Sequence, residues 1–391
     1  MSFVKRNTVL SSPRAGLTPS STPQQQQPKQ EKQLAPGIRP SPTDGRLTTS
    51  TGTASLDQLL AGHGGLPLGT CLLVEEQGTT DFSGILLRYY AAEGLVQGHQ
   101  VHAVAFPPEW RHQLPGLASP DKKSKSASPA PAPEEKMKIA WRYESLGNNA
   151  TAGASTRGDS GAPFCHSFDL SKRLASSESK GTLNPIPVGG APSLDRRTVG
   201  TTSPLKTILK QLKAKLESSG PNAIHRLVVP SLLSPTLYPP GCAQPSEVLQ
   251  FLHGLRALLR QYSTQLTAVI TFPTSLFPRT SGLVRWMEIL CDGVVELIPL
   301  PARLGAAPPP PSGSDPKANQ QPQGMFKVYT LPVYHEKGGG GAESGNFREN
   351  LSFSLSASRG LVIKPYALPP MLEDEPEKKP STAPKKDNLE F

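Results

Sequence analysis

The chain has 391 residues, of which 43 are proline and 35 are glycine, and only 36% are hydrophobic. This composition excludes a chain that packs along its whole length, so we expect one domain with long disordered inserts. The formal net charge of +10 favours polyanionic partners such as nucleic acid over neutral ligands. No window has the roughly 18 apolar residues of a membrane helix, and the four scattered cysteines and eight histidines show no metal-ligand spacing.

Residues 1–45 are rich in Pro, Gln, Ser and Thr and lack a sustained apolar period, which predicts a disordered N-terminal tail. Tracts of similar composition predict disordered inserts and a disordered C-terminal tail. The inserts are expected near 119–135, 148–163, 177–203, 305–323 and 336–346, and the C-terminal tail over 371–391. The segments that remain between 46 and 370 suit a single α/β domain.

In chain order, that domain alternates β-rich apolar runs with helical periods. Strands are predicted over 70–75, 100–106, 226–229, 267–272, 294–299, 326–331, 351–356 and 360–364. Their alternation with helices is typical of a central, mostly parallel sheet flanked by helices. The last strands follow one another closely, which predicts antiparallel pairing among them.

Helices are predicted from their apolar stripes after the turn at Gly78, and over 204–217, 248–259 and 283–290. Gly293, just after the last of them, is predicted to be its C-cap. In the helix over 204–217, Lys206, Lys210 and Lys213 share one face. That pattern predicts a solvated surface, with nucleic-acid contact as the alternative.

The run LLVEEQGTTDFSG places a strand, a glycine turn and a helix in the layout of a nucleotide site. Before it, the phrase TGTASLDQLLAGHGGLPLG resembles the opening of RecA-like ATPases, which precedes their first core strand and phosphate loop. The positions that match are Thr51, Gly52, Leu56, Asp57, Leu59, Leu60, Gly65, Leu66, Pro67 and Gly69. This resemblance implies a RecA-like, P-loop-type fold.

The phosphate loop itself is degenerate. In the pattern G-x-x-x-x-G-K-[ST], glycines let backbone N–H groups converge on phosphates, and the lysine and hydroxyl meet phosphate and magnesium. Around Gly78, the four defining positions are occupied in turn by Glu75, Thr80, Asp81 and Phe82. An aspartate in place of the lysine repels a triphosphate, and Asp81 is equally an ordinary acid at a helix N-terminus.

Two further catalytic positions of RecA-like enzymes differ. Pro230 and Ser231 follow the strand whose end would carry the acidic residue that holds magnesium-bound water. Phe272 and Pro273 stand where recombinases carry a polar sensor pair. The residues therefore predict that the chain is not an enzyme, with no catalytic residue, no metal and no cofactor of its own.

Two other polar groups are interpreted structurally. His99 and His102 lie on opposite faces of a predicted strand, so they are not a ligand pair. Cys165 and His166 have no nearby Asp or Asn in the sequence, which argues against a catalytic thiol.

Phosphate contacts would give RNA affinity without sequence readout, and basic residues in loops are the candidates for them. Arg279 follows the sensor-like strand, in a loop that faces the pore of RecA-like rings. The other RNA-binding candidates are Lys172, Arg173, Arg196 and Arg197.

Four phrases together resemble the PAXNEB family, whose members are described as the fourth subunit of the Elongator complex. The phrases are the segment from GIRPSP to LLVEE, IAWRY, FCHSFDLSKR and GLVIKPYALPP. The resemblance implies a ring of six RecA-like subunits, built with Elongator subunits five and six, that binds tRNA. It also implies an accessory role to the Elongator catalytic core in modifying the wobble uridine of tRNA anticodons. The same resemblance implies that ATP could bind at the ring interfaces, that the chain does not enter a membrane, and that it is located in the cytoplasm and nucleus.

Two alternatives stay open at this point. The chain could be a divergent RecA-like ATPase that acts on nucleic acid with ATP at subunit junctions. It could also be an interaction hub whose proline-rich inserts, such as the PPPP run at 308–311, recruit partners.

Overall fold

The computed structural model describes residues 34–42, 44–60, 64–118, 163–188, 203–301, 322–332, 350–357 and 360–366. All of them lie in the compact unit Leu34–Phe391. Within these ranges, no helix has the length and apolar character needed to cross a membrane. The predicted block 136–147, most of the predicted inserts and the C-terminal tail lie outside them.

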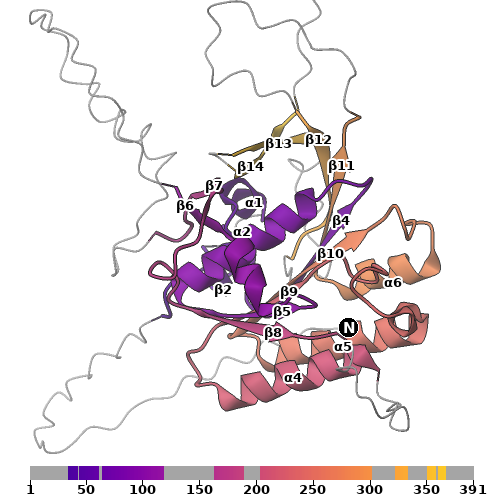
Figure 1. Ribbon diagram of the computed structural model, residues 1–391, viewed down its shortest axis with the longest axis horizontal. Helices are drawn as coiled ribbons and strands as arrows, with labels where there is room; N and C mark the ends of the chain where they lie inside the picture. Colours follow the sequence, from indigo (N-terminus) through magenta and orange to yellow (C-terminus); the bar gives the residue numbers. More distant parts are fainter. Residues whose placement is uncertain are drawn as a thin grey trace, which may run out of the picture. The chain divides into compact units, whose positions relative to one another are not determined.

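The central sheet has nine strands in the described residues, in the order β14-β13-β12-β11-β4-β10-β9-β5-β8 (Figure 1). Along the chain they are β4 (Cys71–Glu76), β5 (Gln100–Val104), β8 (Thr182–Ile186), β9 (His225–Val229), β10 (Leu266–Pro273), β11 (Gly293–Pro299), β12 (Gly324–Thr330), β13 (Leu351–Ser356) and β14 (Gly360–Pro365). From β11 to β8 the neighbours run parallel, and β12, β13 and β14 add an antiparallel edge. The predicted RecA-like α/β fold, with an antiparallel end, is confirmed.

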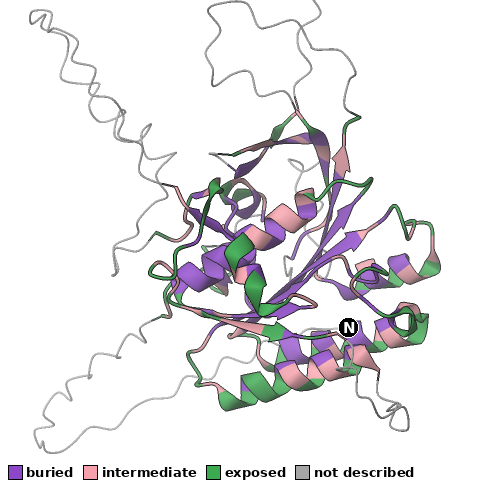
Figure 2. Cartoon of the chain, viewed as in Figure 1, coloured by how far each residue is buried: buried purple, intermediate pink, exposed green. Residues whose placement is uncertain are grey.

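Helices cover both faces of this sheet (Figure 1). Helices α1 (Ala54–Leu59) and α2 (Phe82–Gln97) pack on one face, and α4 (Pro204–Ser218), α5 (Pro245–Gln261) and α6 (Gly282–Leu290) pack on the other. Along β4, Leu72 and Val74 point to the α2 side, whereas Cys71 and Leu73 point to the α4–α6 side. The strands are therefore buried on both faces, as Figure 2 shows, which explains why they are continuous apolar runs.

Smaller elements complete the domain. Strands β1 (Ile38–Pro40), β2 (Leu47–Thr49) and β3 (Leu66–Pro67) form an antiparallel sheet, and β6 (Pro115–Leu117) pairs with β7 (Phe168–Arg173). Two 3-10 helices, η1 (Pro108–Gln113) and η3 (Pro240–Ala243), lie in connections.

Three sequence predictions are wrong in detail. The N-terminal tail was expected to extend to residue 45, but Ile38 pairs with Thr49 in β1 and β2. The insert 177–203 was expected to be disordered, but its residues 182–186 form β8, an edge strand that tolerates Pro185 because one side of it needs no ladder hydrogen bond. Helix α6 ends at the extended residue Cys291, and Gly293 begins β11 instead of capping the helix.

Candidate functional site

The candidate site is the connection between β4 and α2, at the carboxyl ends of the parallel strands. Strand β4 ends at Glu76, Gly78 adopts the left-handed φ of +83°, and α2 begins at Phe82. A positive φ favours glycine, which lets the chain reverse here. Strand β4 lies between the parallel strands β10 and β11, so the β4–α2 connection lies beside the carboxyl ends of both of these strands. The predicted order of strand, glycine turn and helix is confirmed.

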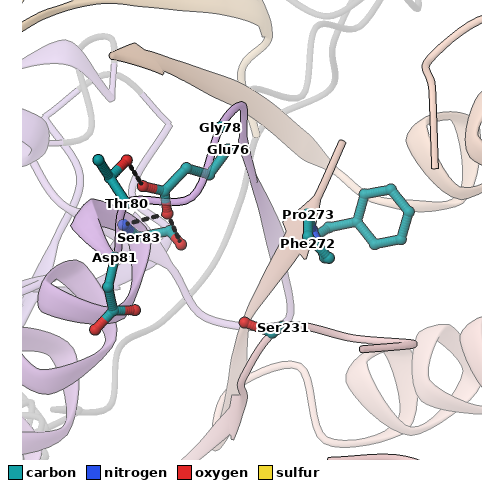
Figure 3. A pocket seen from close by; sticks show the side chains of 8 residues that line it. All are labelled: Glu76, Gly78, Thr80, Asp81, Ser83, Ser231, Phe272 and Pro273. Carbon is teal, nitrogen blue, oxygen red and sulfur yellow. Dashed lines mark hydrogen bonds between the residues drawn. The ribbon is translucent and has the colours of Figure 1, made fainter. Parts of the chain in front are cut away.

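The carboxylate of Glu76 occupies the N-terminus of α2 (Figure 3). Its Oε1 accepts hydrogen bonds from Thr80 Oγ1 at 2.7 Å and from the Phe82 amide at 2.9 Å. Its Oε2 accepts from the Ser83 amide at 3.0 Å and from the Ser83 hydroxyl. In phosphate loops, donors at this place converge on phosphate oxygens because the helix N-terminus attracts anions. Here the chain's own carboxylate takes that position.

The space at this site is also small. A cavity of about 50 Å³ lies beside Glu76. Its lining includes Ser231, at the position predicted to lack the magnesium-binding acid, and Phe272 and Pro273, at the position predicted to lack the polar sensor pair. Pockets that hold small ligands usually measure about 300 Å³ or more. The cavity beside Glu76 is therefore smaller than a usual ligand pocket.

The two residues that replace the lysine and the serine have other contacts. Asp81 points away from Glu76, makes no capping hydrogen bond to α2, and forms an exposed ion pair with Arg88 at 2.7 Å (Figure 3). The ring of Phe82 packs edge-on against Phe353 at 4.8 Å between centroids. Neither side chain offers a cation or a hydroxyl group to a phosphate.

Glu75 faces the other side of β4 and is fully buried. Arg279 Nε lies 3.0 Å from Glu75 Oε2 and donates a hydrogen bond to Glu288 Oε1 at 2.8 Å, while its guanidinium lies over the Tyr329 ring at 3.5 Å. The Glu75 oxygens accept no hydrogen bond in the described residues, so the contact with Arg279 is an ion pair without hydrogen-bond geometry. Burial, with help from the charge of Glu288, raises the pKa of Glu75 to about 8.

This network changes the interpretation of Arg279. Its side chain is 28% exposed, and the carboxylate of Glu288 and the buried carboxyl group of Glu75 lie against it, so its charge is already partly neutralised. Lys172 and Arg173 are exposed in β7, which pairs with β6 outside the central sheet, and Arg196 and Arg197 lie outside the described residues. RNA contact by these residues stays a prediction.

The RecA-like phrase before β4 has a structural role. The buried carboxylate of Asp57 accepts hydrogen bonds from the Ser50 hydroxyl at 2.6 Å and from the amide and hydroxyl of Thr51 at 2.8 and 2.7 Å. Burial nevertheless raises the pKa of Asp57, with these hydrogen bonds opposing the shift. The fully buried Arg226 of β9 donates to the Ser50 carbonyl at 2.9 Å and to the Tyr90 carbonyl at 3.0 Å. Asp57, one of the matched residues, therefore binds Ser50, and Arg226 connects Ser50 to α2 and to β9 of the central sheet.

The histidines near β5 are structural, as predicted. His102 Nε2 lies 2.9 Å from His225 Nδ1 in a stacked, buried pair. His99 accepts a hydrogen bond from Arg226 and also contacts the Pro36 carbonyl. Burial lowers the pKa of His99 and of His102 to about 3 and that of His225 to about 4, so all three stay neutral.

Cys165 and His166 have acidic neighbours that the sequence did not show. His166 Nδ1 lies 3.0 Å from the buried Glu93 Oε1, because α2 passes beside this segment. Burial raises the pKa of the Cys165 thiol, and the charges of Asp57 and Glu93 raise it further, so the thiol is not activated. All four cysteines are free, and within the described ranges no cluster of His, Cys, Asp and Glu could hold a metal ion.

Comparisons with known proteins extend these observations. The model of the PAXNEB protein family matches residues 31–391. Elongator complex protein 4 of Schizosaccharomyces pombe is 32% identical over 370 residues, which cover 90% of this chain and 94% of that protein. The proteins of the same name from Saccharomyces cerevisiae and Homo sapiens are 28% and 32% identical, over 77% and 67% of this chain and 70% and 65% of theirs. A solved KaiC-like protein from Pyrococcus horikoshii OT3 aligns over 81% of this chain and 99% of that one, with a TM-score of 0.38 and 13% identity, and the fold assignment above does not depend on it.

Proposed function

Because the chain belongs to the PAXNEB protein family, we propose that it is a non-catalytic subunit of the Elongator complex, assembled with Elongator subunits five and six into a hetero-hexameric ring of RecA-like domains. The curated relatives are named Elongator complex protein 4, which supports an Elongator role and partners within that complex. We propose further that the ring binds tRNA and supports wobble-uridine modification by the catalytic core, in the cytoplasm and nucleus.

One observation carries the non-catalytic part of this proposal, namely the carboxylate of Glu76 at the N-terminus of α2. It holds the donors that a nucleotide would need and repels a second anion at the same place. ATP at a ring interface would then depend on residues of the neighbouring subunits. Labelled ATP should not be retained by the purified chain, whereas saturable retention that Asp81→Lys alters would favour the ATPase alternative.

An apolar surface fits a protein partner. Trp286 and Ile289 are three positions apart on the outer side of α6 and are each 55% exposed. Large apolar side chains that gather on a surface mark sites of protein association, and tryptophan is enriched where such contacts contribute most. We assign this surface to a neighbouring subunit of the ring.

The assembly experiment uses the chain co-expressed with Elongator subunits five and six. The pair of substitutions Trp286→Ser and Ile289→Ser should strongly reduce recovery of the ring by size-exclusion chromatography, because it removes the apolar surface while leaving the buried side of α6 intact. Leu300→Ser, at a residue that is 43% exposed elsewhere on the domain, is the matched control. Full recovery of the ring with the double variant would contradict this assignment.

A further inference from the structure

A row of lysines follows the outer side of α4. The helix buries Leu205, Ile208, Leu212 and Leu216 against the sheet. Lys206, Lys210 and Lys213 recur at i, i+4 and i+7 and are exposed, with the side chains of Lys206 and Lys213 at 50% and 53%. At a rise of about 1.5 Å per residue, this row is about 10 Å long.

Helix α5 lies beside this row and adds charge of the same sign (Figure 1). Lys206 Nζ is 3.8 Å from Glu247 Oε1 near the start of both helices, and Gly254 of α5 faces Leu209 further along, so the two helices run in the same direction. The charged side chains of the two helices comprise six cations and two acids: Lys206, Lys210, Lys213, Lys215, Arg256 and Arg260 against Glu217 and Glu247. The outer face of α4 and α5 therefore carries a surplus of positive charge.

The acids do little to neutralise the lysine row. Lys213 lies 3.7 Å from Glu217 and Lys206 lies 3.8 Å from Glu247. Both lysines are about half exposed, and ion pairs at such sites contribute about 0–1 kcal/mol. No acidic side chain of the described part of the chain lies within ion-pair distance of Lys210. This arrangement contrasts with Arg279, which contacts Glu288 and Glu75 in a part-buried network.

The residue types of this face distinguish between possible partners. Within the described ranges, neither α4 nor α5 exposes a large apolar side chain, and Figure 2 shows exposed residues along the outer side of both helices. Lysine is depleted at protein–protein interfaces, and membrane-surface helices need an exposed apolar face, so both of these partners fit poorly. Nucleic-acid interfaces are strongly positive, and a face without exposed aromatic rings would contact phosphates and not bases.

We propose that the outer face of α4 and α5, centred on Lys206, Lys210 and Lys213, binds the phosphate backbone of RNA. The choice of RNA as the nucleic acid rests on the function proposed above, and the location rests on the residues of this face. A nucleic-acid strand advances about 3.4 Å per phosphate along a duplex axis, so the row covers about three phosphates. Binding of this kind depends on salt and not on base sequence.

The test measures binding of fluorescently labelled tRNA to the ring reconstituted with Elongator subunits five and six, at about 50 mM and about 200 mM salt. The variant is the triple substitution Lys206→Gln, Lys210→Gln and Lys213→Gln. The matched control replaces three exposed lysines outside α4 and α5 in the same way, at Lys180, Lys327 and Lys364. Circular dichroism and recovery of the ring establish that both variants fold and assemble.

The α4 variant should lose affinity about tenfold or more at the lower salt, and the slope of log affinity against log salt should become shallower by about two. The control should bind like the wild type. Equal losses in both triple variants, or unchanged binding by the α4 variant while the wild-type ring binds tRNA, would overturn the assignment and leave the proposed function in place. Loss of ring recovery by the α4 variant alone would identify a protein interface instead. A wild-type ring that binds no tRNA would overturn the tRNA part of the proposed function together with this assignment.

Discussion

Replacing Glu76 by alanine should measure how much the internal carboxylate stabilises the loop. The side chain accepts hydrogen bonds from Thr80, Phe82 and Ser83, and two of the donors are backbone amides of the first turn of α2. A hydrogen bond to a charged group contributes about 1.5–3 kcal/mol, and the cost of burying the carboxylate offsets part of the sum. Because water can reach the vacated donors from the adjoining cavity, we expect Glu76→Ala to lower the free energy of unfolding by about 2–4 kcal/mol.

Urea unfolding followed by circular dichroism at neutral pH gives this value, with Asp81→Ala as the matched control. Asp81 lies in the same loop, but its carboxylate is 62% exposed and its ion pair with Arg88 is at the surface, so its loss should cost less than about 1 kcal/mol. Glu76→Gln keeps the shape but presents an amide NH₂ group to donors, so it should fall between the two. A cost below about 0.5 kcal/mol for Glu76→Ala, or equal costs for the two alanine variants, would refute the assigned role of Glu76.

Three further predictions concern buried ionisable groups. Arg279→Met should lower the free energy of unfolding in urea by about 2–4 kcal/mol, because it leaves the mostly buried carboxylate of Glu288 without its cation, and an added Glu288→Gln should recover part of that loss. The folded-state pKa values of His102 and His225, about 3 and about 4, lie below the ordinary value of about 6.5, so the unfolded chain binds more protons between these limits. Stability should therefore fall as the pH drops below about 6.5, by up to about 1.4 kcal/mol per pH unit for each imidazole, and His102→Leu with His225→Leu should flatten a urea-unfolding series against pH. Cys165 should react with iodoacetamide at pH 8 at least about ten times more slowly than a free thiol, because its pKa is raised, and a rate like that of a free thiol would contradict its burial.

Much of the fold could be predicted because its strands are buried on both faces. Runs such as 267–272 lack the regular alternation of apolar and polar residues that a half-exposed strand needs, and helices cover both sides of the sheet that contains them. The lysine row of α4 could be predicted for a similar reason, since a helical period is local. Strand β8 was missed because its apolar content is low and Pro185 suggests a loop, whereas pairing with β5 at the edge of the sheet stabilises it.

The internal anion could not be predicted from the loop pattern. Glu75 and Glu76 are adjacent in the sequence and point to opposite faces of β4, and only the structure shows that Glu76 faces α2. The partner of Glu75 is Arg279, about two hundred positions further along the chain, so no local pattern connects them. The acidic neighbour of His166 was missed for the same reason, because Glu93 approaches it only through the packing of α2.

Occupation of the phosphate position by Glu76 has a consequence for how the fold is stabilised. A protein that binds a nucleotide in its folded state gains about 2.7 kcal/mol when the ligand is at one hundred times its dissociation constant, so its stability follows the ligand concentration. In this chain the anion at the N-terminus of α2 is part of the polypeptide, and it is present at every nucleotide concentration. The connection between β4 and α2 can therefore keep the sheet and its helices in place without a ligand. Binding of partners would then depend on the surfaces of the fold. The apolar face of α6 and the basic face of α4 both lie on the same side of the sheet. If the proposed ring uses α6 for a neighbour, the shared sheet would hold the α4–α5 face in a set orientation to that neighbour.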